Sequence, residues 1–157
     1  MTSLIHEDTV FVSDKADQEE IFKEIASKLL DKDLVTEDYI DNLIKREQHY
    51  PTALPLSPIN PLLPNIAIPH TESEFVKDTR IVPVKLKHPV MFKNMILPDE
   101  DVEVSFLFMI LNNDEKEQAG LLQNVMDFIN RQDSDELIDF FKLDDPQKIY
   151  DFLKQKF

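Results

Sequence analysis

A histidine beside a proline is the residue of this sequence best placed for chemistry. His70 follows Pro69, which in turn follows the apolar run 66–68. That run has β-branched ends and predicts a short buried strand, which should end at Pro69 because proline cannot donate to a strand ladder. Loops just past a strand end present reactive side chains on a rigid support. Imidazole is partly unprotonated at neutral pH, so His70 could act as a nucleophile toward phosphorus.

Arg46 and Thr52 are the other residues upstream with a suitable chemistry. Arg46 falls near the C-terminal end of a predicted helix, and a guanidinium group is a fixed fork of donors that suits an oxyanion. An arginine at a helix end is more often a solvated surface charge, and a lone histidine after a strand is more often structural. Residue types alone therefore leave both interpretations open.

The spacing of these residues is more informative than their types. Arg46-Glu47, three further residues and Pro51-Thr52 precede the Pro69-His70 pair by about twenty residues. This pattern resembles the IIA components of the bacterial sugar phosphotransferase system, of the fructose/mannitol/galactitol type, and the resemblance extends from about residue 8 to the C-terminus.

The resemblance implies a role for each matched residue. His70 would take a phosphoryl group from the phosphocarrier HPr and pass it to a cysteine of a IIB component, and through it to the membrane component IIC. Arg46 matches the arginine that supports the phosphoryl group. Thr52 matches the threonine of the Pro-Thr pair, and either a phosphate-binding role or a loop hydroxyl bonded to backbone fits it equally well.

Gln118 marks a departure from the mannitol-type pattern. A second histidine in that branch begins the helix after the long strand, and the apolar spacing of Leu121, Leu122 and Val125 places Gln118 there. Glutamine can donate a neutral hydrogen bond to a phosphoryl oxygen but cannot carry a proton. Either the second histidine is dispensable or the alignment shifts by one residue. The loss fits the galactitol-type branch better and suggests uptake of a hexitol.

Two other functions and one other kind of site are compatible with parts of this sequence. Relatives of this type also act as regulatory modules whose phosphorylation state controls a partner, and a purely structural role ranks last. A metal site of His70, Glu72 and Glu74 is not expected, because three ligands within five residues cannot easily surround one ion. A phosphate loop for ATP is excluded by the single glycine, Gly120, so no cofactor is expected and a protein donor is favoured.

Composition narrows the class of protein further. The 157 residues carry a net charge of −14, which disfavours nucleic-acid binding and favours basic partners. The absence of cysteine excludes disulfides, thiol chemistry and the phosphocysteine role of a IIB component. No apolar run approaches the roughly 20 residues needed to cross a bilayer, and residues 1–8 do not resemble a signal peptide. A cytoplasmic protein without membrane insertion is expected.

The hydrophobic pattern predicts one α/β domain over residues 1–157, with a mixed sheet of about five strands flanked by helices. The longest apolar run indicates a central strand covered on both faces, whereas Pro83 moves its own strand toward an edge. Thr36 and Ser134 are predicted to cap helices, and Gly120 to allow close helix packing. The proline-rich segment 51–64 is expected to be a stiff packed loop. The predicted strands are 9–12, 66–68, 79–86, 89–92 and 102–111, and the predicted helices are 18–31, 36–50, 115–129, 134–141 and 146–153.

Overall fold

The computed structural model describes residues 3–157; Met1 and Thr2, which the predicted domain 1–157 includes, lie outside the described residues. Its core is one five-stranded sheet in the order β1-β4-β5-β3-β2. β1 runs parallel to β4 and β3 runs parallel to β5, while the β4–β5 and β2–β3 pairs are antiparallel. The predicted α/β fold with a mixed sheet is confirmed. The strands are β1 (Phe11–Ser13), β2 (Ala53–Leu54), β3 (Asn65–Ala67), β4 (Arg80–Lys93) and β5 (Asp101–Leu111).

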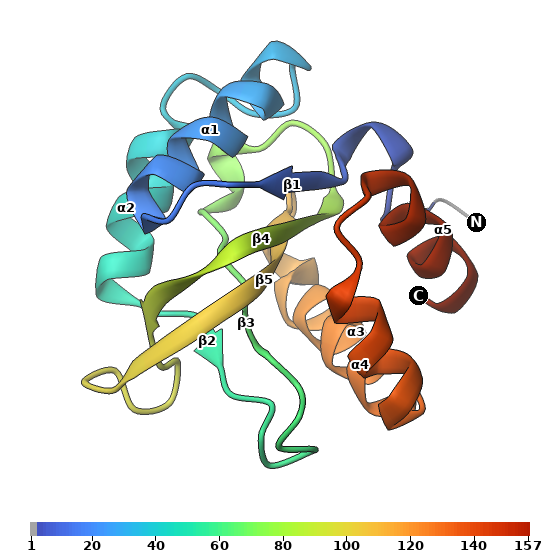
Figure 1. The fold of residues 1–157 in the computed structure, drawn as a ribbon. Helices are drawn as coiled ribbons and strands as arrows, with labels where there is room; N and C mark the ends of the chain where they lie inside the picture. The colour runs from blue at the N-terminus through green and yellow to red at the C-terminus, as the bar shows by residue number, and fades with distance from the viewer. Residues whose placement is uncertain (1–2) are drawn as a thin grey trace.

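Helices cover both faces of this sheet (Figure 1). α1 and α2 lie on one side, and α3, α4 and α5 lie on the other. Short 3-10 helices span Glu7–Thr9, Ser73–Phe75 and Glu115–Glu117. The α-helices are α1 (Gln18–Asp31), α2 (Tyr39–His49), α3 (Gln118–Arg131), α4 (Ser134–Lys142) and α5 (Pro146–Lys156).

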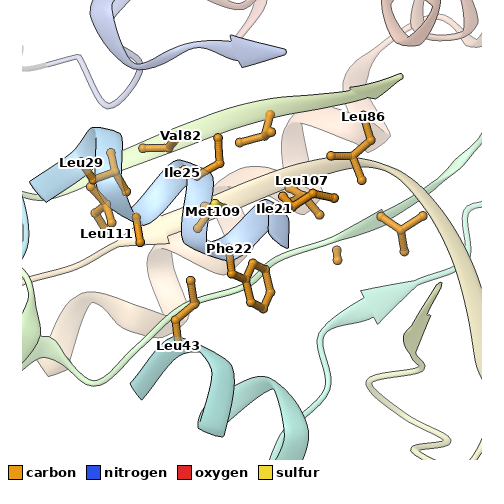
Figure 2. Close-up of a cluster of buried hydrophobic side chains, with 14 of the residues drawn as sticks. Ile21, Phe22, Ile25, Leu29, Leu43, Val82, Leu86, Leu107, Met109 and Leu111 are labelled. Carbon is orange, nitrogen blue, oxygen red and sulfur yellow. The ribbon is translucent and has the colours of Figure 1, made fainter. Parts of the chain in front are cut away.

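The central strand β5 divides the core into two layers. Its run 106–111 is buried throughout, and alternate side chains enter opposite layers because successive side chains of a strand point to opposite faces. Leu107, Met109 and Leu111 pack under α1 and α2, where Figure 2 shows them among Ile21 and other apolar side chains. Phe106, Phe108 and Ile110 pack under the three C-terminal helices. The unbroken apolar run therefore follows from burial on both faces.

β4 differs from the prediction in two ways. It is one strand of 14 residues rather than two pieces, and it lies between β1 and β5 rather than at an edge. Pro83 is tolerated because of where its nitrogen points. The amide of Ile81 donates to Leu4 on the β1 side, and the nitrogen of Pro83, two residues on, faces the same side just before the pairing with β1 begins at Val84. No ladder hydrogen bond is lost there.

Three predictions about the helices need correction, two on their N-caps and one on Gly120. Thr36 does not cap α2: the N-cap is Asp38, and the buried Thr36 hydroxyl has no hydrogen-bond partner in residues 3–157. The cap of α4 is Asp133 instead of Ser134, because its carboxylate accepts from two amides of the first turn. A Cβ on Gly120 would meet nothing within 4 Å, so close packing does not explain this glycine.

Candidate active site

The backbone around His70 is fixed by hydrogen bonds to β5 and to the residue that precedes β2. Ile110 of β5 donates to the carbonyl of Pro69 (3.0 Å), and Ile68 donates to the carbonyl of Thr52 (3.2 Å). β3 ends at Ala67, two residues before the proline, as Pro69 predicted. His70 therefore stands on a support that two chain segments hold in place.

The imidazole of His70 has a defined tautomer. Its Nδ1 lies 2.9 Å from the carbonyl oxygen of Ile68, and because a carbonyl can only accept, Nδ1 carries the proton. Nε2 is left with the lone pair. Burial lowers the pKa of His70, and the charge of Arg46 lowers it further against the opposing effect of the Ile68 hydrogen bond. His70 is therefore held in the neutral, nucleophilic form.

Residues far apart in sequence surround this imidazole. They line one pocket of about 200 Å³ and come from the ends of α2, β3 and β5 and from the start of α3. The pocket brings together three of the four predicted site residues, His70, Arg46 and Gln118. The lining consists of Arg46, His70, Thr71, Glu72, Ser73, Asn112, Glu115 and Gln118.

Arg46 is the cation of the pocket. Its guanidinium lies over the ring of Tyr50 (4.9 Å to the centroid), and its Nη1 lies 3.9 Å from Glu72 Oε1. Its Nε is buried and has no hydrogen-bond partner in residues 3–157. An unpaired buried donor costs about 1–3 kcal/mol, so the hydrogen-bonding capacity of this guanidinium is not fully used by the described residues.

Thr52 lies outside the pocket, and a residue that the sequence analysis did not single out explains why. The carboxylate of Glu47 accepts from the Thr52 hydroxyl (2.7 Å) and from the Thr52 amide (2.8 Å). Thr52 thus ties the end of α2 to the loop before β2. Glu47 is only 5% exposed, and this burial raises its pKa to about 7 although both hydrogen bonds act in the opposite direction. Glu47 follows Leu43 by four residues and therefore falls on the apolar face of α2. This spacing was the signal in the sequence that Glu47 is buried.

Gln118 is the first residue of α3, and a second unpredicted residue contacts it. Asn112, just past the end of β5, is 3% exposed and donates from Nδ2 to Gln118 Oε1 (3.2 Å). Asn112 Oδ1 accepts from the amide of Asp114 (3.0 Å). Both side chains line the pocket. The sequence offered no periodic signal for Asn112, because it lies where the strand pattern has already ended.

The sequence matches one protein-family model over residues 3–156, that of the phosphoenolpyruvate-dependent sugar phosphotransferase system, EIIA 2. The chain belongs to this EIIA 2 family. No curated protein sequence matches this member of the family.

Solved structures share the fold of this EIIA 2 domain. The mannitol IIA of Escherichia coli has a TM-score of 0.73 and 18% identity, covering 95% of this chain and 98% of that one. The E. coli IIA–phosphorylated IIB mannitol complex gives a TM-score of 0.59 and 24% identity over 86% of this chain and 94% of that one. The nitrogen regulatory protein IIA-Ntr of Neisseria meningitidis has a TM-score of 0.64 and 16% sequence identity, and the match covers 96% of each chain.

The other histidines of the EIIA 2 domain are not part of the pocket lining. His49 is the exposed last residue of α2, and His88 is exposed on β4. In residues 3–157, no group of three or more His, Cys, Asp or Glu side chains is arranged to hold a metal ion. No helix within the same residues is long and apolar enough to span a membrane.

Proposed function

We propose that this EIIA 2 domain is a phosphohistidine carrier, which accepts a phosphoryl group from HPr on His70 and passes it to a cysteine of a IIB component. One observation supports this most: the Nδ1–Ile68 hydrogen bond (2.9 Å) leaves Nε2 as the nucleophile in a pocket that also holds Arg46. The family match supports the class of reaction, and the hydrogen bond at Nδ1 favours Nε2 as the reacting atom.

The proposed transfer is a displacement at phosphorus. The lone pair of His70 Nε2 forms the new N–P bond, the bond from phosphorus to the HPr histidine breaks, and its electron pair returns to that histidine. In the second step a IIB thiolate attacks phosphorus and the electron pair of the N–P bond returns to Nε2. Nδ1 keeps its proton and its contact with Ile68 throughout. Nε and the fork of Arg46 would bind the equatorial oxygens, where charge accumulates in such transfers.

The proposed partners follow from the family and from the charge. A similar fold occurs in a complex with phosphorylated IIB, which supports a IIB partner here. The net charge of −14 favours basic docking faces on HPr and IIB and disfavours nucleic acid. We place the protein in the cytoplasm, acting through IIB on a membrane IIC component, with Gln118 in place of a second histidine favouring a galactitol-like hexitol as the sugar.

The test is a labelling experiment with a matched histidine control. The protein is incubated with phosphoenolpyruvate, enzyme I and HPr, and the acid-labile phosphate is located by ³¹P and ¹⁵N NMR. Phosphate is expected on Nε2 of His70, with no labelling of His70→Ala and full labelling of His49→Ala, since His49 is exposed at the end of α2. Full labelling of His70→Ala would refute the proposal.

A second measurement separates transport from regulation. Labelled protein is mixed with a IIB component, and the phosphocysteine formed is followed over time. Fast and complete transfer supports the transport role. Stable phosphohistidine in the presence of each available IIB component would instead favour a regulatory module, a role that the fold shared with IIA-Ntr also accommodates.

A further inference from the structure

The amide group of Gln118 can face the pocket in two ways, and they differ chemically. With its NH₂ inward it donates to a phosphoryl oxygen, whereas with its carbonyl inward it repels that oxygen. A glutamine alone does not determine which end faces His70. The orientation has to be set by a neighbour whose own orientation is fixed.

Asn112 is such a neighbour. The amide of Asp114 lies 3.0 Å from Asn112 Oδ1, and because a backbone N–H can only donate, it fixes which end of the Asn112 side chain is the oxygen. Nδ2 must then face the other way, and it lies 3.2 Å from Gln118 Oε1. The Gln118 oxygen is thus occupied, and Nε2 is left to donate into the pocket that Gln118 lines.

The same loop fixes Asp114 in turn. The Asp114 carboxylate accepts from the amide of Lys116 (3.0 Å) at the start of the 3-10 helix that leads into α3. Asn112 follows Ile110 by two residues, and Ile110 is the residue that binds the backbone at Pro69 beside His70. The end of β5 therefore holds both the nucleophile and the opposite wall of the pocket.

We propose that Asn112 is a positioning residue, which holds the Gln118 amide with its NH₂ toward the phosphoryl group on His70. The proposal rests on the proposed function of His70. In this proposal Asn112 acts only through Gln118. The effect of an Asn112 substitution should therefore disappear when Gln118 is removed.

The first test is a double-mutant cycle on phosphorylation. Phosphoramidate, a small phosphoryl donor that needs no protein partner, is used to label the full chain, and the rate and the lifetime of the phosphohistidine are measured. Gln118→Ala is expected to lower the rate about tenfold, the effect of one hydrogen bond to a charged group. Asn112→Ala should lower the phosphorylation rate several-fold in the wild-type background. In the Gln118→Ala background it should cause no further decrease in this rate. An equal loss in both backgrounds would overturn the proposal.

The second test reverses the amide and includes a charge-matched control. Asn112→Asp is isosteric and keeps the acceptor for Asp114, but its other oxygen would draw Gln118 Nε2 away from the pocket. The rate is expected to fall at least as far as in Gln118→Ala. Asn113→Asp adds the same charge one residue along, where the side chain contacts Thr79 and Lys77, and should stay close to wild type. Equal rates for the two Asp variants would refute the positioning role.

NMR separates positioning from general damage to the fold. The Gln118 side-chain NH₂ resonances should shift when His70 is phosphorylated in the wild type and should not shift in Asn112→Asp. If labelling persists in His70→Ala, the proposed function of His70 fails and this proposal fails with it. If labelling is confined to His70 but the cycle is additive, only the role of Asn112 is lost.

Discussion

The two walls of the pocket differ in the kind of side chain they use. The wall built from α2 and the end of β3 carries Arg46 and His70, and the buried carboxyl of Glu47, next to Arg46 in the chain, bonds to Thr52 outside the pocket. The wall built from the end of β5 and the start of α3 presents the neutral amides of Asn112 and Gln118. His70 and Asn112 are both held by the end of β5, since Ile110 donates to the carbonyl of Pro69 and Asn112 directly follows the strand.

This difference indicates that the two walls have different roles, one in binding charge and the other in orienting a hydrogen-bond donor. A phosphoryl group would bring negative charge into the pocket, and the two side chains that could bind or carry it, Arg46 and His70, are on the α2–β3 wall, whereas the only carboxylate among the lining residues of the β5–α3 wall, Glu115, would repel it. The side-chain amides of the opposite wall provide an oriented hydrogen-bond donor and do not change their protonation state. Changes to Arg46 and His70 should therefore act on the binding of the charged group, and changes to Asn112 and Gln118 on the orientation of the amide donor.

The largest effect on the charged wall is expected from Arg46→Lys. Lysine keeps the positive charge but loses the fork and the Nε donor, so the rate of transfer from HPr should fall about a hundredfold while the thermal unfolding temperature stays near wild type. Arg131→Lys is the control, since Arg131 lies at the far end of α3, where it donates to the carbonyls of Lys156 and Phe157. If the two variants transfer equally fast, Arg46 is a surface charge.

The next effect concerns Glu47 and the pH dependence of stability. Burial raises its pKa from an ordinary 4.5 to about 7, so the folded state holds a proton that the unfolded state releases between these values. The stabilisation is complete below pH 4.5 and is lost as pH rises through about 7, by on the order of 3 kcal/mol. Glu47→Gln keeps a neutral side chain that can bond to Thr52 and should remove this loss.

Urea unfolding at pH 5 and pH 8 checks the Glu47 prediction. From pH 5 to pH 8 the free energy of unfolding of the wild type should fall relative to that of Glu47→Gln. The difference between the two free energies should be smallest at pH 5. Glu37→Gln serves as the control, because Glu37 is exposed in the turn before α2. Parallel behaviour of wild type and Glu47→Gln would mean that the carboxyl titrates as an exposed one does.

Much of the fold could be predicted from the sequence, because its strongest patterns have one physical cause each. The apolar run 106–111 required burial on both faces, and the helical spacing of Ile21, Phe22 and Ile25 required one buried face. β4 was mistaken for two pieces because exposed Lys87 and His88 interrupt its pattern. Whether a proline harms a strand depends on which neighbour its nitrogen faces, and that is a property of the sheet.

The site was predictable only as far as motif spacing extends. Spacing selected His70, Arg46 and Gln118, and the structure brings the three into one pocket. It could not separate Thr52 from the pocket, because the partner of that hydroxyl is the buried side chain of Glu47. Asn112 was missed for the same reason: its role depends on the backbone amide and the glutamine that the loop brings to it.

The smallest expected effect concerns the anion that already contacts Arg46. Glu72 Oε1 lies 3.9 Å from Arg46 Nη1, and the two side chains are 47% and 29% exposed. A phosphoryl group on His70 would compete with this carboxylate for the same guanidinium. Because half-exposed ion pairs contribute at most about 1 kcal/mol, Glu72→Gln should shift the phosphoryl equilibrium between HPr and this protein toward His70 by no more than about fivefold.

The dependence on salt distinguishes this pair from the general acidity of the protein. Glu74→Gln removes the same charge from an exposed residue two positions on that forms no ion pair with Arg46. The equilibrium is measured for both variants at low salt and at physiological salt, where charges more than about 8 Å apart are largely screened. A direct contact predicts that the Glu72→Gln effect exceeds that of Glu74→Gln and persists partly in salt. Two equal effects that vanish together would show that the charged wall responds to the overall field and not to one carboxylate.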